Sequence, residues 1–268
     1  MKLTFCSLSS GSSGNCYYLG NEKLGILIDA GISARRICGY LKEMNLSIEK
    51  IMGILVTHNH SDHVYGLQTL TKKYNIPVFT TETVWKNILK QLSLKRLPGD
   101  CIRKISVQEK FQLAGFDIEA FPVSHDTPET LGFHICAGSK RFTIVTDLGH
   151  ICENAAKFIS AANFLVIESN YDEQMLLNGK YPQFLKDRIH GNNGHLDNQH
   201  TSDFLAENIH DELSHICLAH LSIENNSPEK AIETIRKTFI AKGKSFDSKP
   251  SLVVLKRNVP SEIIYLEG

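Results

Sequence analysis

Short apolar runs alternate along the chain with polar segments, several of which show helical spacing. The predicted strands are Leu3 to Leu8, Cys16 to Leu19, Leu24 to Asp29, Ile51 to Val56, Ile102 to Val107, Phe111 to Val123, Leu131 to Ala137, Arg141 to Thr146, Phe164 to Ile167, Ile216 to Ala219 and Ser251 to Leu255. The predicted helices are Ser33 to Met44, Val64 to Tyr74, Glu82 to Gln91, His200 to His210 and Pro228 to Lys242. Strands dominate each half and helices intersperse them. This pattern predicts an α/β fold with two sheets packed face to face and helices outside.

Composition narrows the class of protein. With 268 residues, 42% of them hydrophobic, the chain can bury a large core, and we expect one domain over residues 1–268. Lys+Arg and Asp+Glu are both 29, so no global charge steers nucleic acid or membranes. The N-terminus does not resemble a signal peptide, and no apolar run reaches the roughly 18 residues of a membrane span. Seven scattered cysteines without a CxxC pair suggest reduced thiols and a cytoplasmic protein.

A dense polar motif follows one predicted strand directly. Ile54 to Gly66 reads ILVTHNHSDHVYG and carries three histidines and an aspartate within six positions, His58 to His63. The motif is expected on the loop between the strand and the next helix, where side chains can converge. Neutral imidazole and carboxylate are ligands that zinc and manganese accept. The alternative is a polar turn with incidental histidines, but the density of ligand types favours half of a metal site.

Three further ligand types stand where apolar strands end. His125 follows FPVS, Asp147 follows FTIVT, and His220 follows ICLA. Each of these residues taken alone is typical of a capping or surface position. Together with His58, His60, Asp62 and His63 they complete two coordination spheres. The sequence therefore predicts a pair of metal ions.

The order of these residues, together with Asp29 in LIDAG, resembles the metallo-β-lactamase superfamily of hydrolases over nearly the whole chain. The resemblance implies an αββα four-layer sandwich of two mixed β-sheets with outer helices. The implied ligands are His58, His60 and His125 for one ion and Asp62, His63 and His220 for the other. Asp147 would bridge the two ions, zinc or manganese, and Asp29 would orient the ligands from behind.

An aspartate at the bridging position favours a particular chemistry. In two-metal sites the ions lie roughly 3.5–4 Å apart and clamp the attacking and leaving oxygens, which suits phosphodiesters. No cysteine ends the strand before Asp147, unlike in the true lactamases. Cys152 falls at an apparent helix start and is expected to be structural.

Other stretches resemble one branch of the superfamily. SLSSGSSGNCYYL, GHLDNQ at 194–199 and HLSIENNSPEKA at 220–231 are similar to the WalJ (YycJ, VicX) branch, which lacks the inserted domain of the β-CASP nucleases. That resemblance implies an exonuclease acting 5′-to-3′ on duplex DNA. His195 and Glu168 also resemble the histidine and glutamate of ribonuclease Z-type enzymes. A glutamate at a strand end can orient an imidazole that protonates a leaving alkoxide. The predicted catalytic residues are Asp62, His195 and Glu168.

The glycine-serine loop admits two interpretations. It is either a tight turn or a substrate loop in which Ser9, Ser12, Ser13 and Asn15 cradle a phosphate. The histidines expected to lie outside the ligand set are His134, His150, His190, His200, His210 and His215. The basic residues that would contribute to a DNA groove are Lys95, Arg96, Arg103, Lys186 and Arg188.

The predicted function is metal-assisted phosphodiester hydrolysis with DNA as substrate. One alternative is a small-molecule hydrolase, such as a cyclic phosphodiesterase or a glyoxalase II-like thioesterase. Another is a regulatory protein that keeps the fold without catalysis, against which the complete ligand set argues. Neutral net charge argues against tight duplex binding, because such binding usually needs several phosphate contacts from Lys or Arg.

Overall fold

The computed structural model describes residues 3–91, 94, 97–244 and 250–266. Contacts divide the chain into two compact units. Unit 1 comprises Met1–Phe121, Thr127–Lys140 and Lys256–Gly268, and unit 2 comprises Pro122–Asp126 and Arg141–Leu255. Within the described residues the strands form two mixed sheets of seven strands each. The expectation of a single domain over residues 1–268 stays a prediction.

Unit 1 contains the whole first sheet. Its strand order is β14 (Ile264–Leu266), β1 (Leu3–Ser9), β2 (Cys16–Gly20), β3 (Gly25–Ile28), β4 (Ile51–Leu55), β5 (Val78–Thr80) and β6 (Ile102–Lys104). The pairs from β14 to β3 are antiparallel, whereas those from β3 to β6 are parallel. All four residues of β3 are buried, as expected for a strand covered on both faces.

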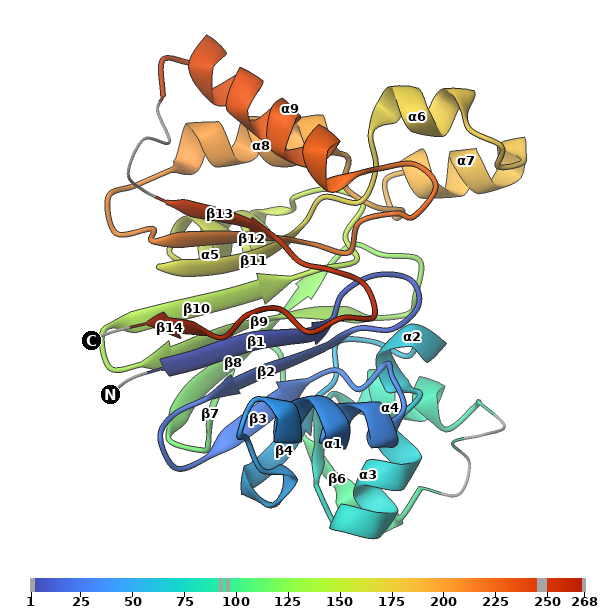
Figure 1. Cartoon of the computed structure of the whole chain (residues 1–268). Helices are drawn as coiled ribbons and strands as arrows, with labels where there is room; N and C mark the ends of the chain where they lie inside the picture. Colours follow the sequence, from blue (N-terminus) through green and yellow to red (C-terminus); the bar gives the residue numbers. More distant parts are fainter. Residues whose placement is uncertain (1–2, 92–93, 95–96, 245–249, 267–268) are drawn as a thin grey trace. The chain divides into compact units, whose positions relative to one another are not determined.

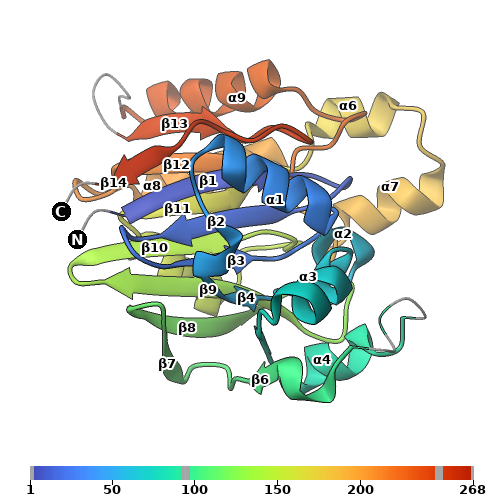
Figure 2. The same ribbon diagram turned by 60° about the horizontal axis from the view of Figure 1, so that its bottom comes forward.

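Helices α1 (Ala34–Glu43) and α3 (Leu67–Tyr74) contact each other and cover one face of this sheet (Figure 2). The side chain of Ser33 caps α1 by accepting a hydrogen bond from the Arg36 N–H. The buried residues Ala34, Ile37 and Leu41 follow helical spacing, which turns one apolar side of α1 inward. Unit 1 also contains α2 (Ser61–Val64), α4 (Glu82–Ile88) and the 3₁₀ turns Ile48–Lys50 and Gly99–Cys101.

Strands of the second sheet pack on the first within unit 1. These strands are β7 (Lys110–Leu113), β8 (Phe116–Val123, whose last two residues belong to unit 2) and β9 (Thr130–Ala137). Phe79 of β5 and Phe111 of β7 stack with ring centroids 5.7 Å apart. A Cβ atom on Gly53 of β4 would lie 2.6 Å from the Phe79 ring, so only glycine allows this close approach.

Unit 2 is built on four parallel strands in the order β13 (Ser251–Val254), β12 (His215–Ala219), β11 (Phe164–Glu168) and β10 (Lys140–Val145, whose first residue belongs to unit 1). Its helices are α5 (Glu153–Ser160), α6 (Glu173–Asn178), α7 (Gln183–His190), α8 (Asn198–Asn208) and α9 (Pro228–Ala241). Helices α8 and α9 pack side by side (Figure 1). Because parallel strands end at the same sheet edge, β10, β11 and β12 bring the residues that follow them together.

The structure corrects one detail of the sequence interpretation. Asp62 and His63 lie in the short helix α2, not on a loop, while His58 and His60 precede it. The His60 carbonyl accepts a hydrogen bond from the His63 N–H at 3.0 Å, so the chain turns helical directly after the second histidine. The motif is polar throughout, and a prediction from apolar spacing could not detect this turn.

The next observations concern the expectations about cysteine thiols and membrane-spanning helices. All seven cysteines, each within the described residues, are free thiols, and Cys6, Cys16 and Cys217 are buried. Cys152 is the N-cap residue of α5, which agrees with its expected position at a helix start. In the part of the chain that the structure describes, no helix is long and apolar enough to cross a membrane.

Candidate metal centre and catalytic residues

Three predicted site residues share an uncommon backbone conformation. Asp29, Asp147 and His220 have φ angles of 58°, 59° and 56°, in the left-handed region. Each comes one or two residues after the end of β3, β10 or β12. Non-glycine residues seldom adopt this conformation, and aspartate and histidine are among those that tolerate it best. The left-handed turn aims a polar side chain where a regular strand would not, which is typical of functional sites.

In unit 1 the motif residues form a compact imidazole and carboxylate cluster. The ring centroid of His58 lies 4.6 Å from that of His60 and 4.1 Å from that of His63. The Nε2 atom of His63 lies 3.5 Å from Asp62 Oδ2. The side chains of His58 and His63 are fully buried. Buried polar side chains so close together need a common partner or a network to offset their desolvation.

Asp29 provides part of that network. Its Oδ2 atom lies 2.8 Å from His63 Nδ1, and its Oδ1 atom accepts a hydrogen bond of 2.9 Å from the Thr57 N–H. Burial raises the pKa of Asp29, while His63 and Thr57 act in the opposite direction. A carboxylate can only accept, so Nδ1 of His63 carries the proton and the lone pair lies on Nε2. Asp29 therefore holds the Nδ1 side of His63, and its role behind a metal ligand stays a prediction.

The glycine-serine loop reaches the same cluster through Asn15. The Nδ2 atom of Asn15 lies 3.0 Å from His63 Nε2 and 3.4 Å from Asp62 Oδ2. Its Oδ1 atom accepts hydrogen bonds from the Gly11 N–H at 2.8 Å and from the Tyr17 hydroxyl at 3.3 Å. These two donors fix which way the amide faces. Tyr17 and Thr57 were not singled out in the sequence, because neither carries a metal-ligand side chain.

The three loop serines predicted to contact a phosphate divide into two groups. Ser9 is buried and accepts a hydrogen bond of 3.1 Å from the Asn258 N–H, which is a structural contact. Ser12 and Ser13 are exposed and, with Arg36 and Asp62, line a cavity of about 410 Å³ in unit 1. Arg36 was not predicted, and its helical position gave no signal for a site.

In unit 2 four candidate residues converge. Asp147, Glu168, His195 and His220 each offer one ligand atom, and these atoms lie within 4.8 Å of one another. The Nδ1 atom of His220 lies 3.4 Å from Asp147 Oδ1, and that of His195 lies 3.9 Å from the same oxygen. Asp147 and His220 are buried, while the His195 side chain keeps 17% of its surface exposed. Of the two histidines, His195 is the more accessible.

Glu168 is the centre of this group. Its Oε1 atom lies 2.9 Å from His195 Nδ1 and 2.7 Å from His220 Nδ1, and its Oε2 atom accepts from the Leu148 and Leu196 N–H groups. Burial by itself would raise the pKa of Glu168, but the two imidazoles hold it well below its usual range. The side chain is therefore a carboxylate that orients both rings.

His125 joins the group from the loop after β8. Its Nδ1 atom lies 3.0 Å from the Gly194 carbonyl oxygen, and its Nε2 atom lies 3.8 Å from Asp147 Oδ1. A carbonyl can only accept, so Nδ1 carries the proton and the lone pair lies on Nε2. His125, His63 and His220 thus share one arrangement, in which an oxygen acceptor on Nδ1 prepares Nε2 as a ligand atom. Metal-bound histidines typically have such an acceptor.

The donor sets fit a borderline divalent ion. They consist of imidazole nitrogens and carboxylate oxygens, which suit zinc and manganese, and contain no thiolate. Cys152 occupies the N-cap position of α5 without a side-chain capping hydrogen bond, and its Sγ atom lies 3.7 Å from the Pro122 carbonyl oxygen, consistent with a packing role.

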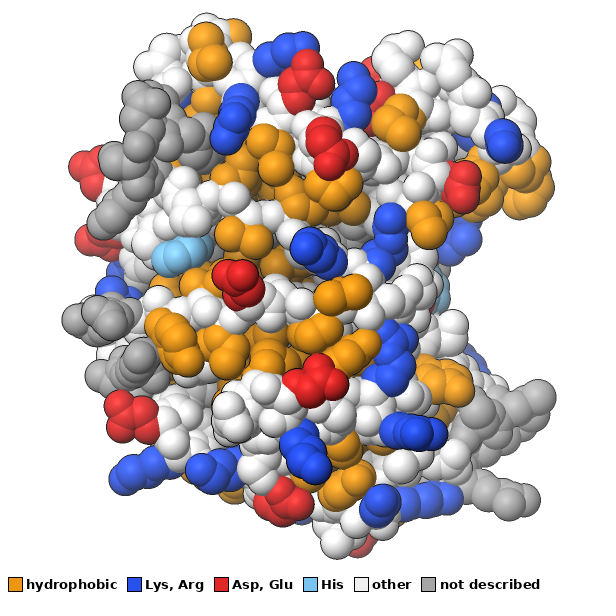
Figure 3. All heavy atoms as spheres, in the orientation of Figure 1, with side chains coloured by type: hydrophobic (Ala, Val, Ile, Leu, Met, Phe, Trp, Pro, Cys, Tyr) orange, Lys and Arg blue, Asp and Glu red, His pale blue; other side chains and the backbone are white. Residues whose placement is uncertain are grey.

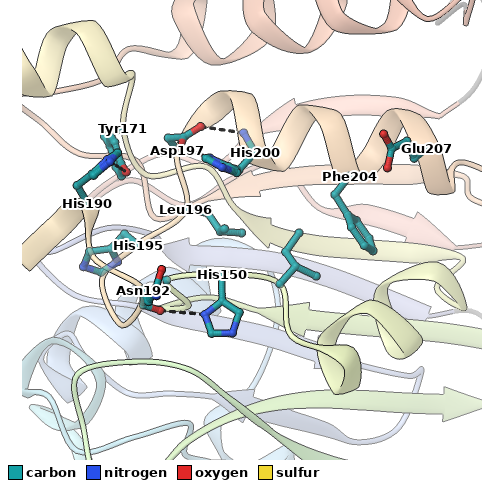
Figure 4. Close-up of a pocket in the computed structure, with 12 residues that line it drawn as sticks. His150, Tyr171, His190, Asn192, His195, Leu196, Asp197, His200, Phe204 and Glu207 are labelled. Atoms are coloured by element: carbon teal, nitrogen blue, oxygen red, sulfur yellow. Dashed lines mark hydrogen bonds and ion pairs between the residues drawn. The ribbon is translucent and has the colours of Figure 1, made fainter.

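The histidines set aside in the sequence have different surroundings. His215 stacks on Phe164 with ring centroids 5.1 Å apart, and His134 lies within β9. By contrast, His150, His190 and His200 line a cavity in unit 2 together with His195 (Figure 4). Their position beside the catalytic candidate was not visible in the sequence, because three separate segments bring them together.

The basic residues proposed for a DNA groove make local contacts where they are described. Lys186 donates to the Leu177 carbonyl at 2.6 Å, Arg188 pairs with Asp126, and Arg103 donates to the Asp100 carbonyl at 2.8 Å. Lys95 and Arg96 lie outside the described residues. On the face in Figure 3, basic and acidic side chains are interspersed over α9. A basic groove stays a prediction.

The sequence and the fold of the chain are similar to those of known proteins. A family model described as "Beta-lactamase superfamily domain" matches residues 25–214. The chain is 37% identical to exodeoxyribonuclease YycJ of Bacillus anthracis, over 91% of each chain. It is 33% identical to exodeoxyribonuclease WalJ of Streptococcus pneumoniae, over 85% of each chain. Among solved structures, the metallo-β-lactamase fold protein YhfI of Bacillus subtilis superposes with a TM-score of 0.73, 14% identity and 99% coverage of both chains. This likeness confirms the predicted fold class.

Proposed function

Because the chain belongs to the metallo-β-lactamase superfamily of metal-dependent hydrolases, in the branch that contains YycJ and WalJ, we propose that it is a DNA exonuclease. The observation that carries this proposal is the position of Glu168 in unit 2. One carboxylate holds both a candidate metal ligand, His220, and a more accessible imidazole, His195. This arrangement would place a metal ligand and a proton donor side by side, which suits metal-assisted phosphodiester hydrolysis.

Two divalent ions, zinc or manganese, are the proposed cofactors. His58, His60 and His125 would hold one ion, Asp62, His63 and His220 the other, and Asp147 would bridge them, as the family resemblance implies. Ions held there would lower the pKa of water and neutralise charge on the phosphodiester. The donor chemistry supports this assignment, since Asp29, Gly194 and Glu168 each hold the Nδ1 side of one proposed ligand.

His195 is the proposed general acid. A water oxygen forms a new bond to phosphorus, the bond from phosphorus to the sugar oxygen breaks, and His195 gives its proton to that leaving oxygen. The proton lost by the water passes to solvent. The Nδ1 atom of His195 faces the Glu168 carboxylate. The Nε2 atom, on the opposite edge of the ring, therefore points away from Glu168 and is the proposed proton donor. The negative charge of Glu168 also stabilises the protonated ring before transfer.

The exposed part of the glycine-serine loop is the proposed phosphate contact. Ser12 and Ser13 line a cavity with Arg36, whose guanidinium is held by the Asn258 carbonyl at 3.0 Å. Hydroxyls and a guanidinium are suited to a phosphate of the substrate strand. Ser9 and Asn15, which have buried partners, would support the loop from within. Attack from the 5′ end of duplex DNA and a cytoplasmic location complete the proposal.

The test is a metal-titrated assay of the purified protein on 5′-phosphorylated duplex DNA, single strands, RNA and cyclic nucleotides. We expect progressive release of nucleotides from the duplex, with zinc or manganese required. Asp147→Asn should abolish this release and leave the circular dichroism spectrum unchanged. Turnover of cyclic nucleotides without DNA cleavage would favour the small-molecule hydrolase instead. A protein that binds the ions and hydrolyses none of these substrates would favour a regulatory role.

A further inference from the structure

A cavity of about 500 Å³ lies in unit 2, beside the proposed general acid (Figure 4). Its walls come from the loop after β10, the loop that carries His195, and helix α8. Cavities that hold one small ligand typically have volumes of roughly 300–1,000 Å³. The cavity thus has room for a single nucleoside but not for a duplex.

The lining combines apolar side chains with polar groups. Leu196, Ile151 and the half-buried ring of Phe204 supply the apolar part. Figure 4 shows Phe204 projecting from α8 toward the space bordered by Leu196 and His150. The His150 ring is held by the Asn192 carbonyl oxygen, 3.0 Å from Nδ1, and by the Ser124 hydroxyl, 3.4 Å from Nε2. Two ring systems, one of them fixed, suit a planar base.

The polar part of the lining offers hydrogen-bond acceptors. Among the described residues, no lysine or arginine lines the cavity, whereas the carboxylates of Asp197 and Glu207 do. Asp197 pairs with His200, and Glu207 pairs with Lys242, so neither carboxylate is an isolated charge. Carboxylate oxygens accept hydrogen bonds from the amino groups and hydroxyls of a nucleoside, which suits the base and sugar of a nucleotide.

His195 connects this cavity to the proposed hydrolysis of the phosphodiester. It lines the cavity, and Glu168 holds its Nδ1 at 2.9 Å. A general acid must touch the oxygen that leaves phosphorus. The sugar that carries this oxygen must then lie on the same side of the imidazole as the proton it receives.

We propose that this cavity binds the nucleoside of the leaving nucleotide, with its base on Phe204 and its sugar oxygen at His195. The inference rests on the proposed phosphodiesterase function and specifies what the site holds after the bond breaks. A cavity that accepts one nucleoside favours cleavage next to a strand end. The released mononucleotide should therefore be a competitive inhibitor.

Inhibition by deoxyadenosine 5′-monophosphate and by inorganic phosphate tests the proposal on the metal-loaded protein with a duplex DNA substrate. Base stacking on an aromatic side chain is typically worth roughly 5- to 150-fold in binding. Phe204→Ala should raise the inhibition constant of the mononucleotide by a factor in this range and leave that of phosphate unchanged. Phe204→Leu keeps apolar volume but removes the π-face, and it should show most of the same loss. Phe204→Trp should retain inhibition.

Phe184→Ala is the matched control, because Phe184 is 74% exposed on α7 and does not line the cavity. It should leave both inhibition constants unchanged. Equal inhibition constants for the mononucleotide in the wild type, Phe204→Ala and Phe204→Leu would overturn the inference, while DNA cleavage by the wild type would still support the exonuclease. Conversely, if the protein does not cleave DNA but calorimetry shows Phe204-dependent binding of the mononucleotide, the proposed function would be overturned and the nucleoside site retained.

Discussion

In unit 1 the four candidate ligands fall within six consecutive residues, His58 to His63, whereas the three candidate ligands of unit 2 are dispersed from His125 to His220. The first set is brought together by one strand end and the short helix α2. The second set is brought together by parallel strands that end at one sheet edge. A local motif can be recognised by its density, but a dispersed set is recognised only when the topology is known.

The supporting residues of the two units also differ. In unit 1, Asp29 and Asn15 contact His63, so the network serves the proposed ligands alone. In unit 2, Glu168 contacts His220 and the more accessible His195. We infer that the histidine cluster of unit 1 acts through metal affinity, and that the cluster of unit 2 acts through metal affinity and proton transfer together. Substitutions in the two units should therefore have different effects on metal content and on turnover.

The largest effect is expected from removing one ligand in each unit. His58→Ala and His220→Ala should each reduce the bound metal from two ions toward one. Turnover of duplex DNA should fall by more than the about 10–100-fold typical of residues that only orient ligands. Elemental analysis and a DNA assay check this. Full metal retention in both variants would contradict the ligand assignment.

The next effect separates proton transfer from metal binding. His195→Ala should slow cleavage of DNA by about 10²–10⁴-fold, the usual contribution of general acid catalysis. Bis-p-nitrophenyl phosphate should be affected much less, because its phenolate leaves without protonation. Metal content should not change. Glu168→Gln should show the same selectivity more weakly, and His210→Ala, a unit 2 histidine outside the cluster and the cavity, should behave as the wild type. Equal losses on both substrates would reject the proton donor.

The candidate ligands of both units could be predicted from the sequence, and the reason is physical. His58 to His63 stood out because ligand types are dense there, and His125, Asp147 and His220 stood out because each follows an apolar run. The strands β5 and β14 were not predicted, since three residues each give no periodicity. The contact between Asn15 and His63, and the wall formed by His150 and Phe204, depend on packing between distant segments. No local pattern encodes those contacts.

A smaller effect is expected at Asp29, which tests whether the histidine cluster of unit 1 acts through metal affinity alone. Asp29→Asn keeps the shape of the side chain but removes the negative charge beside His63 Nδ1. Metal affinity should fall by about 10–100-fold. Turnover of DNA and of bis-p-nitrophenyl phosphate should fall by the same factor, and added metal should restore both. If turnover of only one substrate falls and added metal does not restore it, Asp29 does not act through metal affinity alone.

The smallest effect concerns the start of α8, at the edge of the unit 2 cavity. Asp197 caps this helix by accepting a hydrogen bond of 2.8 Å from the His200 N–H, and its carboxylate also pairs with the His200 ring. That pairing raises the pKa of His200 above its usual value. The stabilisation by the ion pair is therefore complete below the ordinary pKa of histidine. It is lost as the pH rises through the raised value of the folded protein.

Chemical unfolding of His200→Gln and the wild type at pH 6 and pH 9 measures this contribution. The difference in unfolding free energy should be larger at pH 6, and it should stay below about 1 kcal/mol because the His200 side chain is 76% exposed. Asp197→Asn keeps a capping oxygen and should lose only the pH-dependent part. Asp197→Ala should lose a further amount of about 0.5–2 kcal/mol at both pH values, because the cap is removed. If His200→Gln is equally destabilised at pH 6 and pH 9, the pair does not contribute through its charge, and Asp197 acts on α8 as a cap alone.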